Sequence, residues 1–365
     1  MNLCIALPSR PRELYQEIGG MFLDVLSGTA VSASLVNDGD KLALGADALL
    51  MIGDCLEFEG YATLLSKRRY SRPETILWLF DTLPPCALEG KTANAALRLR
   101  YYDRALHFAK TRLKPIRTMI PLPIRRKLGL AACSALLRGI REAPDSAQQE
   151  LLKADVNSQY EIFGRYEWFS RHYPEGWLDH VFVNTRPNET FLRESGMQAE
   201  FIPLGSHPTW GVDMGIERDI DVIFFGELAY GRRKSIVEAV QRSLASRGIT
   251  LTIVDGNCYG EDRTRLLNRA KISLNVPRFT WDIPTIRFFI SMSCGVLAVS
   301  EEMGATEPFE AGKHLVQAKA EDLADVIIHY LQHEGERLAI TNSASQLMAE
   351  LTLRGNVFRV LSVPE

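Results

Sequence analysis

Three cations follow the first strand expected in the second half of the chain. The run 220–225 is apolar and β-branched, and Gly226 precedes Arg232, Arg233 and Lys234. Glycine lets the backbone approach a ligand, whereas cations at a helix N-terminus oppose the helix dipole unless an anion lies nearby. A diphosphate would supply that anion. The alternative is a basic helix start that faces solvent, as charge runs usually do.

An acidic residue, Asp81, follows the apolar run 75–80 in the first half. Ligands of open parallel sheets bind at the carboxyl ends of the strands, so this side chain is expected to point into a cleft. There a carboxylate can take the proton of an attacking hydroxyl. Two alternatives remain: Asp81 caps a helix or turn, or it only orients the substrate.

Other chemical signatures are absent from the sequence. It contains neither G-x-G-x-x-G nor G-x-x-x-x-G-K-[ST], which removes the main support for a dinucleotide dehydrogenase or a P-loop enzyme. The histidines show no metal-ligand spacing, and Asp38 and Asp40 belong to a turn-like run. The six cysteines lie far apart, as is typical of reduced thiols in a cytoplasmic protein. We therefore expect no metal site and no cofactor.

The elements that must position these residues alternate between strand and helix. Strands without polar alternation are typical of a parallel sheet that is covered on both faces. In the second half, the expected strands are 220–225, 249–254, 272–276, 295–299 and 314–316. The loop after the second of them contains Gly256, at the same expected sheet edge as Gly226.

The first half shows the same pattern with one long interruption. The expected strands are 3–7, 30–36, 48–52, 75–80 and 180–184. Between about 88 and 170 only helical and proline-broken segments occur, which predicts a helical insertion. The link 202–213 predicts a boundary between domains 1–209 and 210–365; the alternative is one large sheet.

The composition is that of a globular protein. The chain has 365 residues, of which 46% are hydrophobic, and a formal net charge of −3. This length exceeds one ordinary core. The charge argues against a nucleic-acid-binding chain, and no apolar stretch approaches the ~20 residues of a membrane span.

A family pattern follows the third expected strand of the second half. That strand ends near Asn275, and a helix that begins near Thr285 carries Arg287 and ends in Cys294-Gly295. Further on, Phe309-Glu-Ala-Gly-Lys leads into another strand. This pattern resembles the donor-binding half of GT-B glycosyltransferases, most closely the CgeB-like enzymes related to spore maturation proteins. The resemblance covers 180–350 well and 1–85 loosely, but not the insertion.

The resemblance implies a fold and an activity. It implies two Rossmann-like, doubly wound α/β domains that face a cleft, with a nucleotide sugar held mainly by the C-terminal domain. It also implies a glycosyltransferase of the hexosyltransferase type, with a donor as substrate and an acceptor (a glycan, lipid-linked molecule, protein or small molecule) entering from the N-terminal domain. The expected catalytic residue is Asp81. The expected donor-binding residues are Gly226, Arg232, Lys234, Gly256, Asn275, Thr285, Arg287 and Glu310.

One departure from the family pattern concerns the helix of Arg287. The family has a glutamate three residues after the arginine, which grips the nucleotide ribose, whereas this chain has Ile290. Either Glu307 or Glu310 replaces it, or the donor differs, or the site is degenerate. Arg287 keeps the family position, with a structural ion pair as its alternative role.

The insertion contains a strongly basic stretch. Residues 97–141 hold 12 Lys and Arg against one acidic residue, Asp103, a local net charge of +11. Basic and apolar residues at helical spacing suit an anionic membrane surface or a polyanionic acceptor. The alternative is a basic subdomain that faces the acidic remainder of the chain.

Together these features predict a metal-independent glycosyltransferase of the cytoplasm, peripheral at the inner membrane face through 97–141. Two other functions stay open. One is a degenerate nucleotide-sugar-binding or scaffold protein of an envelope glycan pathway, and the other is a nucleotide-sugar epimerase.

Overall fold

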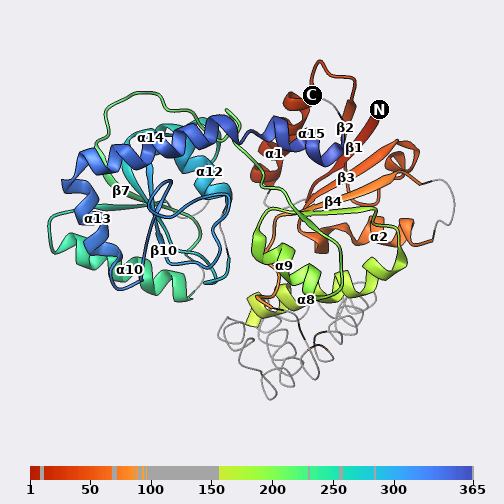
Figure 1. Ribbon diagram of the computed structural model, residues 1–365, viewed down its shortest axis with the longest axis horizontal. Helices are drawn as coiled ribbons and strands as arrows, with labels where there is room; N and C mark the ends of the chain where they lie inside the picture. The colour runs from red at the N-terminus through yellow and green to blue at the C-terminus, as the bar shows by residue number, and fades with distance from the viewer. Residues whose placement is uncertain are drawn as a thin grey trace, which may run out of the picture.

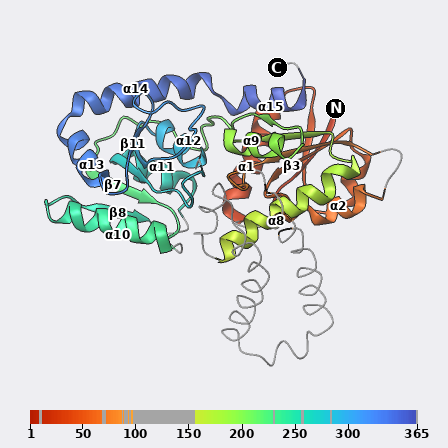
Figure 2. The same ribbon diagram turned by 60° about the horizontal axis from the view of Figure 1, so that its bottom comes forward.

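The computed structural model describes residues 1–8, 12–67, 72–86, 88, 93, 96, 156–228, 231–254, 258–282 and 285–363. These residues form two all-parallel sheets, each covered by helices (Figures 1 and 2). The two doubly wound sheets predicted from the sequence are confirmed. Gly256 and the basic stretch 97–141 lie outside the described residues.

The first sheet has six strands in the order β2-β1-β3-β4-β5-β6. β3 is buried at every position, as expected for a strand with helices on both faces. The strands are β1 (Asn2–Ala6), β2 (Ser32–Val36), β3 (Ala48–Gly53), β4 (Glu74–Leu79), β5 (His180–Val183) and β6 (Glu200–Phe201). The helices are α1 (Arg12–Leu26), η1 (Lys41–Gly45), η2 (Cys55–Phe58), α2 (Glu59–Leu65), α8 (Val156–His172), η5 (Tyr173–Glu175) and α9 (Arg186–Glu194).

The second sheet has five strands in the order β11-β10-β9-β7-β8. Its strands are β7 (Ile220–Phe225), β8 (Leu251–Val254), β9 (Ala270–Asn275), β10 (Leu297–Glu301) and β11 (Val316–Ala318). Its helices are α10 (Gly231–Ala245), α11 (Gly260–Asn268), α12 (Thr285–Ser293), α13 (Leu323–Gln332) and α14 (Glu334–Glu350). α10 buries Val237, Val240 and Leu244, which recur at helical spacing and fix the face that packs on the sheet.

The chain passes twice between the two sheets. The first passage follows β6, and the second follows α14, after which α15 (Leu353–Leu361) lies beside α1 on the first sheet (Figure 1). The passages pair through Ser206 and Leu353, whose backbone groups bond at 2.8 Å. Gly205 has a φ of 98°, and a Cβ there would lie 2.5 Å from the Leu353 nitrogen. Only glycine allows this close approach.

Candidate functional site

A cavity of ≈ 1080 Å³ lies between the two sheets. The residues that line it follow the carboxyl ends of strands in both: Asp81 after β4, Asn184 after β5, Gly226 after β7 and Asn275 at the end of β9. Parallel sheets bind ligands at this edge, and here the two edges share one space. Among the described residues, the lining contains six basic side chains and three acidic ones, so it favours an anionic ligand.

The second sheet supplies the cationic wall. Arg287, on the first turn of α12, donates a hydrogen bond of 3.1 Å to the Asn275 side-chain oxygen. The guanidinium also lies against Gly226, whose φ is 144°, and a Cβ at that position would come within 3.3 Å of its central carbon. Lys234, on the first turn of α10, lines the cavity as well. The structure thus brings Gly226, Lys234, Asn275 and Arg287 together.

Thr285 joins the two domains inside the cavity. Its hydroxyl accepts a hydrogen bond of 3.1 Å from the Asn184 side-chain amide, and both residues are almost fully buried. Asn184 follows β5 of the first sheet, whereas Thr285 begins α12 of the second. The N-terminus of α12 therefore faces the cavity, where its unpaired N–H groups favour an anion.

Two of the expected donor-binding residues that the structure describes, Arg232 and Glu310, are not among the cavity-lining residues. Arg232 forms an ion pair with buried Glu301 at the end of β10, and its neighbour Arg233 lines the cavity in its place. Arg233 is 4% exposed and donates to the Glu227 carbonyl at 3.1 Å. The exposed Glu310 pairs with Lys313 at 3.0 Å, away from the cavity. Gly256 lies outside the described residues.

Ile290 lies in the cavity wall. It is 9% exposed and belongs to the apolar core cluster that includes Phe288 and Phe289. Neither Glu310 nor Glu307 is among the residues that line the cavity, so the structure brings neither of the two suggested replacements to its wall. At this position the cavity presents an aliphatic surface.

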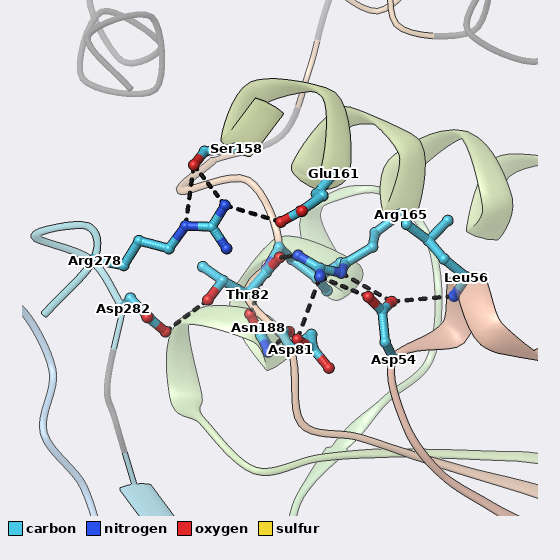
Figure 3. A network of polar contacts seen from close by, with 11 residues as sticks. Asp54, Leu56, Asp81, Thr82, Ser158, Glu161, Arg165, Asn188, Arg278 and Asp282 are labelled. Atoms are coloured by element: carbon cyan, nitrogen blue, oxygen red, sulfur yellow. Dashed lines mark hydrogen bonds and ion pairs between the residues drawn. The ribbon is translucent and has the colours of Figure 1, made fainter. Parts of the chain in front are cut away.

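The first sheet supplies a carboxylate, Asp81, held from one side (Figure 3). Its Oδ1 lies 3.3 Å from Nη2 of Arg165. The same guanidinium binds Asp54, with Nε donating to Oδ1 at 3.0 Å and Nη2 donating to Oδ2 at 2.7 Å. Desolvation in this pocket, together with the negative charge of Asp54, raises the pKa of Asp81 to about 7, although Arg165 acts in the opposite direction. Asp81 keeps 33% of its side chain exposed and can therefore meet a ligand.

The loop between β9 and α12 binds to the first domain. Thr82 donates a hydrogen bond of 2.6 Å to Asp282, and the Trp281 indole donates to the Leu83 carbonyl at 3.1 Å. Phe279 is part of the apolar cluster under the first sheet. Arg278 reaches α8, where it contacts Ser158 and Glu161 (Figure 3). These contacts join the two domains beside the cavity, whose lining includes Thr82, Arg278 and Asp282.

Sequence reasoning missed Arg165, because it fell within the stretch interpreted as an insertion outside the site. A signal was present in the helical period of α8. Ile162, Arg165 and Phe169 recur at spacings of three and four residues, so the arginine lies on the apolar, buried face. A buried arginine requires acidic partners, which would have pointed to the carboxylates of the site.

Across the described residues, no three His, Cys, Asp or Glu side chains gather closely enough to hold a metal ion. No helix in the described part of the chain is long and apolar enough to span a bilayer.

Comparison with known proteins identifies one matching family model. Residues 232–357 match a model described as "Glycosyl transferase-like". This match begins at α10 and ends within α15, so it covers the cationic wall of the cavity apart from Gly226. No curated protein matches the chain by sequence.

Solved structures resemble the whole chain. Sucrose-phosphate synthase (tll1590) from Thermosynechococcus elongatus matches with a TM-score of 0.58 and 10% identity, over 99% of both chains. Alr3699/HepE from Anabaena, solved with UDP-glucose, matches with a TM-score of 0.54 and 10% identity, over 99% of this chain and 98% of its own. TarM matches with a TM-score of 0.50 and 9% identity over 88% of this chain, which spans 56% of TarM. These likenesses establish the two-domain GT-B fold.

Proposed function

We propose that this GT-B protein is a glycosyltransferase that transfers a sugar from a nucleotide-sugar donor bound in the interdomain cavity. One observation carries the proposal: the cavity holds a cationic wall on one side and Asp81 on the other. A nucleotide sugar has a diphosphate to bind and a sugar to pass on, and the two walls match these parts. The glycosyl transferase-like match over 232–357 supports the same assignment.

The donor diphosphate is assigned to the cations near α10 and α12. Arg287 and Lys234 would bind its oxygens, with Asn275 orienting Arg287 and Arg233 adding positive charge. Preorganised charges of this kind stabilise a departing diphosphate as its negative charge grows. The UDP-glucose in the Anabaena structure supports UDP as the first nucleotide to test.

Asp81 is assigned to the acceptor. An acceptor hydroxyl gives its proton to Asp81 while its oxygen bonds to the anomeric carbon of the donor sugar. The bond between that carbon and the distal phosphate oxygen breaks, and its electron pair stays on the nucleoside diphosphate. A pKa near 7 suits a general base at neutral pH. This course inverts the anomeric configuration; retention in the product would leave Asp81 only the role of orienting the acceptor.

The transfer is proposed to need no metal ion. The cations of the cavity wall can carry the diphosphate charge that Mg²⁺ neutralises elsewhere. Activity should therefore be unchanged by EDTA. Loss of turnover in EDTA, restored by Mg²⁺ or Mn²⁺, would contradict this part of the proposal.

Within the GT-B glycosyltransferases, we assign the protein to the CgeB-like enzymes, from the pattern around Asn275, Arg287 and Gly295. Ile290 departs from that pattern and favours one alternative, a protein that binds a nucleotide sugar without transferring it. Binding without turnover would support the alternative.

Contact with a membrane is proposed from the sequence of 97–141, which lies outside the described residues. Its charge of +11 would place a cytoplasmic enzyme at an anionic surface. Flotation with anionic and neutral vesicles tests this contact. A variant in which Arg125, Arg126 and Lys127 are changed to Glu should bind the anionic vesicles less. Equal behaviour of the two vesicle types would contradict it.

A donor panel tests the main proposal. Purified protein is incubated with UDP-, GDP-, ADP- and dTDP-sugars, and release of the nucleoside diphosphate, with water as acceptor, is followed by mass spectrometry. We expect release from one nucleotide class and loss of release in Asp81→Asn. No release from any donor, together with no thermal stabilisation by any nucleoside diphosphate, would overturn the proposal, because a ligand of the folded state raises its stability.

A further inference from the structure

One face of α8 lines the network that surrounds Asp81. Ser158, Glu161 and Arg165 recur at spacings of three and four residues, so they lie on the same side of the helix. In Figure 3 all three point toward the polar network: Ser158 and Glu161 meet Arg278 of the second domain, and Arg165 meets the carboxylates of the first. The helix is therefore part of the site.

Each of the three guanidinium nitrogens of Arg165 donates a hydrogen bond. Nε and Nη2 form a two-pronged ion pair with Asp54, and Nη1 donates to the Thr82 carbonyl at 3.0 Å. Asp54 is fixed in turn, because its Oδ1 accepts a hydrogen bond of 3.1 Å from the Leu56 backbone. Only 5% of the arginine side chain is exposed. Such an arrangement leaves the guanidinium little freedom to move.

The contact with Asp81 is one-sided. Arg165 reaches Oδ1 at 3.3 Å, while Oδ2 has no hydrogen-bond partner within the described part of the chain. The backbone of Asp81 is held separately, because Asn188 donates to its carbonyl at 2.9 Å. One oxygen is thus oriented, and the other remains available to the cavity.

We propose that Arg165, clamped by Asp54, is a positioning residue that orients the Asp81 carboxylate and sets its affinity for the acceptor proton. The inference rests on the proposed function and deepens it. With both carboxylates ionised, Arg165, Asp54 and Asp81 carry a net charge of −1. Transfer of the acceptor proton to Oδ2 of Asp81 makes the trio neutral. The positive charge of Arg165 keeps the Asp81 carboxylate ionised before the reaction. The negative charge of Asp54 prevents Asp81 from becoming too weak a base.

Other charged groups also act on Asp81. Asp282, from the loop after β9, and Glu161, from α8, add negative charge. Glu161 is partly neutralised by Arg278 at 2.9 Å, and the Asp282 carboxylate accepts the hydroxyl of Thr82. Tyr15 of α1 also lies in the field of Asp81 but is uncharged near neutral pH. Among the described residues, Arg165 is the cation in direct contact with Asp81, and Asp54 is the neighbouring charge that acts on it most strongly, so these two residues are the ones to change.

The test compares variants whose expected pKa shifts have opposite signs. In Arg165→Met, loss of the opposite charge should raise the pKa of Asp81 by about one to two units. In Asp54→Asn, loss of a like charge should lower it by at least as much, because Asp54 acts on Asp81 more strongly than Arg165 does. Arg165→Lys keeps the charge and should return the pKa toward the native value. A merely structural role for Arg165 would reduce activity in these variants without moving the pKa in opposite directions.

Two readouts separate the inference from the proposed function. The first is the pH profile of kcat/KM for donor turnover. Its rising limb should move to higher pH in Arg165→Met and to lower pH in Asp54→Asn. The second needs no turnover: the difference in thermal stability between each protein and its Asp81→Asn derivative, measured from pH 4 to 9, reports the pKa of Asp81 directly.

The outcomes are distinct. Opposite shifts in both readouts support the inference. Opposite shifts in stability, without donor turnover and without stabilisation by any nucleoside diphosphate, support the charge coupling and overturn the proposed function. Turnover with an unmoved limb in both variants overturns the positioning role. If Arg165→Met fails to fold, Asp54→Asn and Arg165→Lys still decide, because Asn keeps the size of Asp54 and can accept the Leu56 hydrogen bond.

Discussion

Glu17 of α1 and Arg263 of α11 form an ion pair of 2.8 Å between the two domains, with 12% and 3% of their side chains exposed. The other Glu17 oxygen accepts the backbone N–H of Gly260 at 2.5 Å, at the start of α11. Arg263 also donates to the Thr209 carbonyl at 3.1 Å, in the first passage between the sheets. Because Arg263 lines the cavity, this pair holds the cavity wall to the first domain.

Glu17→Ala should destabilise the protein strongly. It leaves the Arg263 guanidinium buried with its countercharge removed, which costs about 3–5 kcal/mol. The control is Glu261→Ala, which breaks an ion pair on the exposed surface of the same helix, where both partners are mostly solvated. That change should cost less than about 1 kcal/mol. Urea denaturation compares them, and equal midpoints would show that the interdomain pair contributes little.

Arg287→Ala should weaken binding of a nucleoside diphosphate about 10–100-fold, because each charge-assisted hydrogen bond to a phosphate is worth roughly 1.5–3 kcal/mol. The folded state should persist, since Asn275 keeps its bond to Ser300. Calorimetric titration with UDP measures the change. Arg269→Ala, which removes an exposed arginine paired with Asp219, is the matched control and should bind normally. Unaltered affinity in Arg287→Ala would assign Arg287 a structural role.

Asp81 should make the protein less stable as the pH rises from about 4 to 7. The folded-state pKa of Asp81 is raised to about 7, above its ordinary value of 3.8, so the protonated form favours folding. This contribution is complete below pH 4 and is lost as the pH passes through 7. Asp81→Asn removes the dependence and should therefore gain stability relative to the native protein at pH 8 but not at pH 4. Parallel melting curves at every pH would contradict a raised pKa.

Ile290→Glu should lower stability by about 2 kcal/mol or more, because it places a carboxylate in an apolar cluster. The control, Ile290→Leu, keeps the volume and apolar character and should cost less than about 1.5 kcal/mol. Thermal melts compare the two variants. A stable Ile290→Glu protein that binds UDP more tightly than the native chain would show instead that this position can serve as a nucleotide contact.

The sheets could be predicted from the sequence because parallel strands buried on both faces read as continuous apolar runs. Ten expected runs overlap observed strands, whereas β6 spans only two residues and leaves no such run. The ends of the strands then indicated where Asp81, Gly226 and Asn275 would meet. These predictions depended on local pattern and on the general geometry of open sheets.

The other parts of the candidate site could not be predicted, because they depend on helical register and on contacts between distant segments. Arg232 and Arg233 are adjacent, and a rotation of about 100° separates them on α10, so the sequence could not decide which faces the cavity. Glu310 was assigned by motif alone, but it is exposed beside Lys313. The bond from Thr82 to Asp282 joins residues 200 positions apart, and no local pattern encodes it.

Hydrogen exchange with and without saturating UDP tests the central claim, that a nucleotide sugar binds in the interdomain cavity. We predict protection of the segments that line its cationic wall, around 222–228 and 272–292. We predict no protection in 196–200, at the far edge of the first sheet, where a second hollow of ≈ 760 Å³ lies. Protection confined to that hollow, or no protection anywhere with UDP, GDP or ADP, would contradict the account.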